Sequence, residues 1–209
     1  VDSEPVHTEA LIDVLEALRL PVPADLHESL LGLSARQVHQ WLVERVGLAL
    51  PFDGLIARKH AAYRRRSSQL QPRPGSRALF DLLARRGLRQ AIVSNSDRVL
   101  VDLNLHAIGL AGPDVVSVSR NDVRCGKPDP EPYLRAATLV GAAASACVVV
   151  EDSPVGAASG LAAGMRVLVW PNPGDAGAAD FPSGVVVVDT IEALAEALAA
   201  NATNPEEPK

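Results

Sequence analysis

The chain has 209 residues, enough for one sizeable core or for a core with a small accessory domain. Hydrophobic residues make up 47% of it, which excludes general disorder, and a formal net charge of −5 gives no overall field that would attract nucleic acid. Its apolar runs are shorter than the roughly 18 residues of a membrane span, and two cysteines, Cys125 and Cys147, fit a reducing compartment. We therefore expect a cytoplasmic protein with no membrane or nucleic-acid partner.

The first third of the chain has a helical pattern. Pro5 suits a first helical turn, and apolar residues recur at helical spacing behind it. Ser34 is a candidate N-cap for a second helix, and a third is expected from about residue 52 to residue 68. Because no strand candidate comes before Gln71, we predict a small helical domain over residues 4–70.

Beyond a Pro- and Gly-rich stretch at residues 71–75, short apolar runs alternate with helical segments. The runs cover residues 90–93, 114–118, 147–150, 166–170 and 185–188. Apolar runs without polar alternation are typical of strands buried on both faces, and their alternation with helices indicates an α/β protein with a doubly wound, Rossmann-like parallel sheet. We assign residues 1–3 and 71–199 to this core and expect residues 200–209 to form a disordered tail.

Polar residues follow two of the predicted strands and lie in one loop between them. Ser94 follows the first strand, Glu151 and Asp152 follow the third, and Lys127 precedes a predicted helix. Ligands of open α/β sheets gather at the carboxyl ends of the strands, so these residues are expected to share one crevice. Ser94 and the backbone N–H groups around Asn95 suit phosphoryl oxygens, Lys127 suits their charge, and the two carboxylates suit Mg²⁺.

Each of these segments also has a local interpretation. Ser94-Asn95-Ser96 fits a strand-to-helix turn, Lys127-Pro128 fits an ordinary loop, and Glu151-Asp152 fits the electrostatics of a helix N-terminus. Their order along the chain and their position at strand ends favour a common site.

Three strings resemble the haloacid dehalogenase superfamily, in the branch that contains β-phosphoglucomutase and small sugar-phosphate phosphatases: residues 92–96 (IVSNS), 126–130 (GKPDP) and 151–158 (EDSPVGAA). The resemblance implies that Ser94 binds the transferring phosphate and that Lys127 stabilises this phosphate and the nucleophile. It also implies that Glu151 and Asp152 hold Mg²⁺ and that residues 4–70 form a mobile cap domain over the substrate.

The resemblance breaks down at the N-terminus. The nucleophile motif of the family, Asp-x-Asp-Gly-Thr, does not occur in the chain, and residues 1–5 resemble the stretch that directly follows it. In the family the first aspartate is the nucleophile, the second is a general acid and base, and their strand is central in the sheet. We expect that the sequence begins downstream of this motif and that the chain as given is inactive; a non-catalytic phosphate-binding remnant is the alternative.

The resemblance offers three substrate contacts in the cap, namely His7, Ser34 and Arg36. His7 falls where sugar-phosphate relatives have a histidine that supports the chemistry, although its place in a first helical turn favours an ordinary exposed residue. Ser34 and Arg36 belong to a candidate substrate loop at residues 32–36, in which Ala35 stands where β-phosphoglucomutase has an arginine. We therefore predict a Mg²⁺-dependent phosphatase of a small phosphorylated metabolite, such as a sugar phosphate, acting through an aspartyl-phosphate intermediate. A phosphomutase is the alternative, and the sequence does not indicate the oligomeric state.

Overall fold

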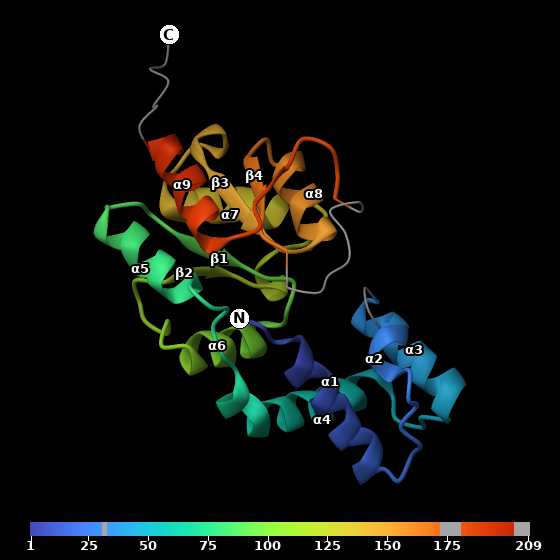
Figure 1. The fold of residues 1–209 in the computed structure, drawn as a ribbon. Helices are drawn as coiled ribbons and strands as arrows, with labels where there is room; N and C mark the ends of the chain where they lie inside the picture. The colour runs from blue at the N-terminus through green and yellow to red at the C-terminus, as the bar shows by residue number, and fades with distance from the viewer. Residues whose placement is uncertain (31–32, 172–180, 203–209) are drawn as a thin grey trace. The chain divides into compact units, whose positions relative to one another are not determined.

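The computed structural model describes residues 1–30, 33–171 and 181–202. The chain divides into two compact units (Figure 1): unit 1 comprises Val1–Arg73 with Asp102–Ala111, and unit 2 comprises Pro74–Val101 with Gly112–Lys209. The sequence did not indicate that residues 102–111 group with the N-terminal helices. Within the described ranges, no helix combines the length and the hydrophobicity needed to cross a membrane.

Unit 1 is built from helices, as the apolar spacing predicts. They are α1 (Glu4–Ala17), α2 (Leu26–Leu30), α3 (Ala35–Val46) and α4 (Phe52–Arg66), followed by a 3₁₀ turn, η1, at Ser67–Gln69. Helices α1 and α4 pack against each other, and Leu11, Leu15, Leu55 and Tyr63 are buried in this unit. The short helix α2 follows Pro21 and Pro23 and was not predicted, because five residues are too few to show a helical period.

Unit 2 contains all five predicted strands, with ends that differ from the prediction by one or two residues. The strands are β1 (Ala91–Val93), β2 (Val116–Val118), β3 (Val148–Glu151), β4 (Arg166–Val169) and β5 (Val186–Val187). The intervening and closing helices are α5 (Ser76–Arg85), α6 (Arg98–Ala107), α7 (Glu131–Val140), α8 (Pro154–Ala162) and α9 (Ile191–Ala202), with 3₁₀ turns η2 (Arg120–Asp122) and η3 (Ala144–Ala146). Helix α6 belongs to both units, since its residues from Asp102 onward group with unit 1. Helix α9 thus runs three residues into the expected tail, and residues 203–209 lie outside the described chain.

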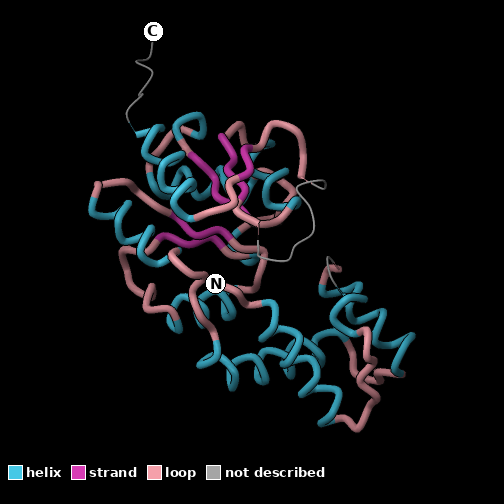
Figure 2. Tube along the Cα trace, viewed as in Figure 1, coloured by secondary structure: helices cyan, strands magenta, loops and turns pink. Residues whose placement is uncertain are grey.

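The strands pair in parallel, as predicted, but they form two sheets (Figure 2). Strand β1 pairs with β2, and β3, β4 and β5 pair in that order. Between β1 and β3 the described residues form no ladder. The carboxyl ends of these two strands are connected by the side chain of Lys127, which contacts Val93 of β1 and Glu151 of β3.

Helices cover both faces of the second sheet. On one face, Val167 and Val169 of β4 pack in a cluster with Tyr133 of α7 and Ala157 of α8. On the other face, Leu168 of β4 packs with residues that include Leu194 of α9. Successive side chains of a strand point to opposite faces, so burial on both sides explains the continuous apolar run in this segment.

Candidate active site

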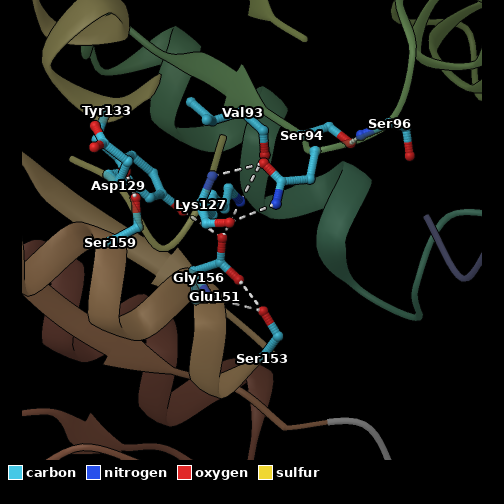
Figure 3. Close-up of polar contacts among 11 residues, drawn as sticks. Val93, Ser94, Ser96, Lys127, Asp129, Tyr133, Glu151, Ser153, Gly156 and Ser159 are labelled. Atoms are coloured by element: carbon cyan, nitrogen blue, oxygen red, sulfur yellow. Dashed lines mark hydrogen bonds and ion pairs between the residues drawn. The ribbon is translucent and has the colours of Figure 1, made fainter. Parts of the chain in front are cut away.

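Lys127 connects the carboxyl ends of the two sheets. It lies in the loop before α7, and its Nζ donates to the carbonyl oxygen of Val93, at the end of β1, over 3.0 Å. The same ammonium forms an ion pair with Oε1 of Glu151, the last residue of β3. Figure 3 shows Lys127 between these two residues. The two charged side chains are only 9% and 7% exposed, so the pair is nearly excluded from water.

The carboxylate of Glu151 is held on both oxygens by protein groups. The Tyr133 hydroxyl donates to Oε1, and the Ser153 hydroxyl donates to Oε2 over 3.1 Å. The first turn of α8 leaves room for this carboxylate, because a Cβ at Gly156 would overlap it. A buried charge is tolerated when it is paired and hydrogen-bonded, and Glu151 meets both conditions.

Tyr133 is a buried donor at this site. Burial, together with the neighbouring Glu151, raises the pKa of the Tyr133 hydroxyl far above its usual value, so the hydroxyl keeps its proton and donates. The Lys127 Nζ also lies 5.0 Å from the centroid of the Tyr133 ring, which is within the range of a cation–π contact. Tyr133 therefore contacts both members of the ion pair.

Ser94 follows the β1 residue whose carbonyl group accepts from Lys127. Its own N–H donates to the Val118 carbonyl oxygen over 2.9 Å, which extends the pairing of β1 with β2 by one residue. Its Oγ accepts from the Ser96 N–H over 3.1 Å. A hydroxyl has one donor besides its acceptor sites, so the Ser94 hydrogen can point to an anion. Lys127 thus joins Glu151 to Val93, the residue before Ser94, and a shared site of Ser94, Lys127 and Glu151 stays a prediction.

Asn95 uses its side chain on the protein itself. Its carboxamide makes two hydrogen bonds with the main chain of Lys127. The prediction that this segment binds phosphate concerns the backbone N–H groups around Asn95, and it stays a prediction.

The acidic residues at the end of β3 fit Mg²⁺ in their donor chemistry. Glu151 and Asp152 offer hard carboxylate oxygens, and Mg²⁺ usually takes one or two protein carboxylates and completes its shell with water and phosphate. Asp152 is partly buried, and its negative charge contributes to the raised pKa of Tyr133. In the part of the chain that is described, no group of three His, Cys, Asp or Glu residues forms a closed metal cage.

His7, in unit 1, is not the exposed first-turn residue that its sequence position favours. It is partly buried, its ring lies 4.6 Å from the Tyr63 ring, and its Nδ1 is buried without a hydrogen-bond partner. Burial, with smaller contributions from Lys59 and His60, lowers the pKa of His7 to about 3. The imidazole is therefore neutral near pH 7.

Ser34 and Arg36 have local contacts within unit 1. Ser34 caps α3 in a capping box with Gln37, in which the Ser34 N–H donates to Gln37 Oε1 over 2.9 Å. The Arg36 guanidinium lies 4.6 Å from the centroid of the Phe52 ring. Gly32 of the expected substrate loop lies outside the described residues. The contacts of His7, Ser34 and Arg36 do not join these three residues to one another.

Three residues of the site were missed from the sequence: Tyr133, Ser153 and Gly156. Ser153 had a usable signal, since a serine directly before a proline is typical of an N-cap followed by the first helical residue, and Ser153 does cap α8. The hydroxyl of Tyr133 and the bare Cα of Gly156 have no comparable signal, because their roles depend on where Glu151 points.

The chain is similar in sequence to known proteins. Residues 1–164 match the family described as haloacid dehalogenase-like hydrolase. Hexitol phosphatase A from Escherichia coli (strain K12) is 41% identical over 102 residues, which are 49% of this chain and 47%, about half, of that protein. The phosphorylated carbohydrates phosphatase of Thermotoga maritima is 27% identical over 167 residues, which are 79% of this chain and 77% of that protein.

A solved structure shares the fold. The crystal structure of a HAD family hydrolase from Deinococcus radiodurans R1, with bound phosphate and sodium, superposes with a TM-score of 0.72 at 27% identity, covering 96% of this chain and 90% of that one. The predicted α/β class is thereby confirmed.

Proposed function

The chain belongs to the haloacid dehalogenase-like hydrolase family, and on this premise we propose that it is a phosphatase of small phosphorylated metabolites. Sugar phosphates are the proposed substrate class. The names of two relatives support this choice, since one is a hexitol phosphatase and the other a phosphatase of phosphorylated carbohydrates. Free thiols at Cys125 and Cys147 are compatible with work in a reducing cytoplasm.

The buried ammonium of Lys127 is the observation that carries the proposal. With the Ser94 hydroxyl, which belongs to the residue after Val93, it would provide the fixed positive charge and the donor that a phosphoryl group needs as negative charge moves during transfer. Glu151 holds this ammonium, and Tyr133 and Ser153 hold Glu151. In this assignment Ser94 binds the phosphate, Lys127 binds and stabilises it, and the N–H groups around Asn95 contribute further donors.

Glu151 and Asp152 are the residues that would hold Mg²⁺. The ion, when bound, would neutralise part of the charge on the phosphate and on the leaving group. Because both oxygens of Glu151 already accept hydrogen bonds, Asp152 would be the main ligand, with Glu151 adding its charge from the side of Lys127.

The proposed nucleophile is an aspartate of an Asp-x-Asp-Gly-Thr motif, which these 209 residues do not contain. Its carboxylate oxygen would attack phosphorus and displace the alcohol oxygen of the substrate, which takes a proton from the second aspartate of the motif. Water would then hydrolyse the aspartyl phosphate and release inorganic phosphate. The missing ladder between β1 and β3 in the described chain supports a further strand at this position.

We also propose that the helical residues 4–70 act as a cap that selects the substrate. Ser34 and Arg36 already have local contacts, so His7 is the strongest of the three candidates in this region. Its buried Nδ1 has no partner, and such a group gains from any hydrogen bond that a substrate-bound state would supply.

The test compares the given chain with the same chain carrying an Asp-x-Asp-Gly-Thr strand in front of Val1. We expect the extended protein to release inorganic phosphate from hexose and hexitol phosphates in the presence of Mg²⁺, and the given chain to release none. The matched control is the extension with its first aspartate changed to asparagine. Inactivity of both proteins across sugar phosphates would refute the proposal, whereas transfer of phosphate to a second sugar hydroxyl without release would favour a phosphomutase.

A further inference from the structure

The carboxamide of Asn95 holds the main chain of Lys127 at two points. The Lys127 N–H donates to Asn95 Oδ1 over 2.8 Å, and Asn95 Nδ2 donates to the Lys127 carbonyl oxygen over 3.0 Å. The amide therefore binds both polar groups of a single residue. This pair of bonds fixes the orientation of the Lys127 backbone, from which its side chain extends to Val93 and Glu151.

Other anchors hold the loop on either side of Lys127. The Glu131 carboxylate accepts from the backbone N–H groups of Arg124 and Cys125, and the Ser159 hydroxyl donates to the Asp129 carbonyl oxygen over 2.6 Å. These contacts restrain the flanks of the loop, but they do not touch Lys127 itself. Direct restraint of its main chain comes from Asn95.

Gly126 provides the space for this contact. A Cβ at residue 126 would lie 2.7 Å from Asn95 Oδ1 and 2.9 Å from Cδ of Arg120. Such distances are too short for nonbonded atoms, so any side chain here would displace the Asn95 amide or the loop. Gly126 and Asn95 therefore depend on each other, because the bare Cα of Gly126 leaves room for the Asn95 amide that binds Lys127.

We propose that Asn95 is a positioning residue that sets the reactive lysine through its backbone. Its consequence for catalysis rests on the proposed function, but the contact itself does not. Only a carboxamide of this length offers one acceptor and one donor side by side; an aspartate accepts but cannot donate, and an alanine does neither. The proposal therefore predicts a graded response of the Lys127 ammonium to Asn95→Asp and Asn95→Ala.

The experiment measures how fast acetic anhydride acetylates Lys127, by mass spectrometry of the folded chain, with Lys59 as internal reference. In the wild type we expect slow labelling, because the Lys127 side chain is 9% exposed and paired with Glu151. Asn95→Ala should raise the ratio of Lys127 to Lys59 labelling about fivefold, as expected when two exposed hydrogen bonds are lost. Asn95→Asp should give a smaller rise, and Gly126→Ala should behave like Asn95→Ala.

Gln90→Glu is the matched control. Gln90 Nε2 donates to the Phe80 carbonyl oxygen over 2.9 Å, so this variant also turns an amide that holds a main-chain carbonyl into an acid. It should leave the labelling ratio unchanged. Circular dichroism checks folding, and if Asn95→Ala does not fold, the comparison of Asn95→Asp with Gln90→Glu decides.

A labelling ratio that stays at the wild-type value in the folded Asn95 variants, or that rises equally in Gln90→Glu, would overturn the proposal. Inorganic phosphate separates this inference from the proposed function. Protection of wild-type Lys127 by phosphate tests the phosphate site, whereas the Asn95 series is read without phosphate. A graded Asn95 effect without phosphate protection would keep the positioning role and count against the proposed phosphate site at Lys127.

Discussion

Two ion pairs, one from each unit, differ in how deeply they are buried, although unit 2 also has more exposed pairs such as Arg77 with Asp81. Unit 2 buries the ion pair of Lys127 and Glu151, with side chains 9% and 7% exposed. Unit 1 keeps its pair of Arg66 and Asp13 nearer the surface, with side chains 24% and 23% exposed, although the two hydrogen bonds between them are short, at 2.7 and 2.8 Å. A partly buried titratable group of unit 1, His7, is held in its neutral form, because its surroundings lower its pKa to about 3.

The difference in burial between these two ion pairs indicates different roles, structural for the more exposed pair and functional for the buried one. A surface ion pair costs little to form and contributes little, while a buried pair must overcome a desolvation penalty that apolar residues of the same size would avoid. Unit 2 accepts this penalty at the strand ends and adds Tyr133 and Ser153 to satisfy the carboxylate. This desolvation penalty is hard to explain by stability alone, and it indicates that the fixed charge of Lys127 has a function.

The largest effect is expected from breaking the buried pair. Lys127→Met leaves the Glu151 carboxylate without its cation, and we expect the free energy of unfolding to fall by about 3–5 kcal/mol. Urea denaturation followed by circular dichroism measures this change. The double variant Lys127→Met with Glu151→Gln should recover most of the loss, and a single variant as stable as the wild type would contradict the buried-pair interpretation.

His7, the partly buried histidine of unit 1, gives an intermediate and pH-dependent effect. The folded chain binds a proton at His7 only near pH 3, but the unfolded chain binds it near pH 6.5, so stability is present above pH 6.5 and is lost as the pH falls from there toward 3. Between pH 7 and pH 5, His7 should lower the free energy of unfolding by about 2 kcal/mol.

Comparison with His7→Gln isolates this contribution, because glutamine does not titrate. The charged neighbours Lys59 and His60 remain in both proteins. Urea denaturation at pH 7 and pH 5 should show a smaller loss in the variant. Equal losses would mean that His7 binds its proton equally well in the folded and unfolded states.

The smallest effect is expected at the exposed pair. Arg66→Met removes the guanidinium that holds Asp13, and we expect a loss of about 0.5–1 kcal/mol, since the partners are partly solvated. The loss should shrink further in high salt, which screens such pairs. If Arg66→Met proved as costly as Lys127→Met, the contrast between the two ion pairs would disappear.

Much of the fold was predictable because each element carries its own local pattern. The five apolar runs became strands, and Ser34 begins its helix with a capping box, as its residue type indicates. The contact of Lys127 with the ends of β1 and β3 was predictable, because parallel strands bring their carboxyl ends to one edge.

What could not be predicted depends on contacts between distant segments. The sequence does not show that Asn95 would bond the backbone 32 residues away, or that residues 102–111 would group with the N-terminal helices. The burial of His7 against Tyr63 likewise arises from the packing of α1 on α4. In each case the local sequence does not indicate the contact, which depends on how distant segments come together in the folded chain.

Two glycines of α8, Gly156 and Gly160, allow this helix to pack closely against the strand ends that carry Glu151. Gly160 lies one helical turn beyond Gly156, and a Cβ there would approach Val167 Cγ2 to 2.9 Å and the methyl groups of Val149 to 3.2 Å. Helix α8 can therefore pack closely against β3 and β4, with its first turn next to the Glu151 carboxylate. A side chain at residue 160 would push α8 away from the sheet and shift Ser153, so we expect an apolar substitution here to weaken the hydrogen bond from Ser153 to Glu151.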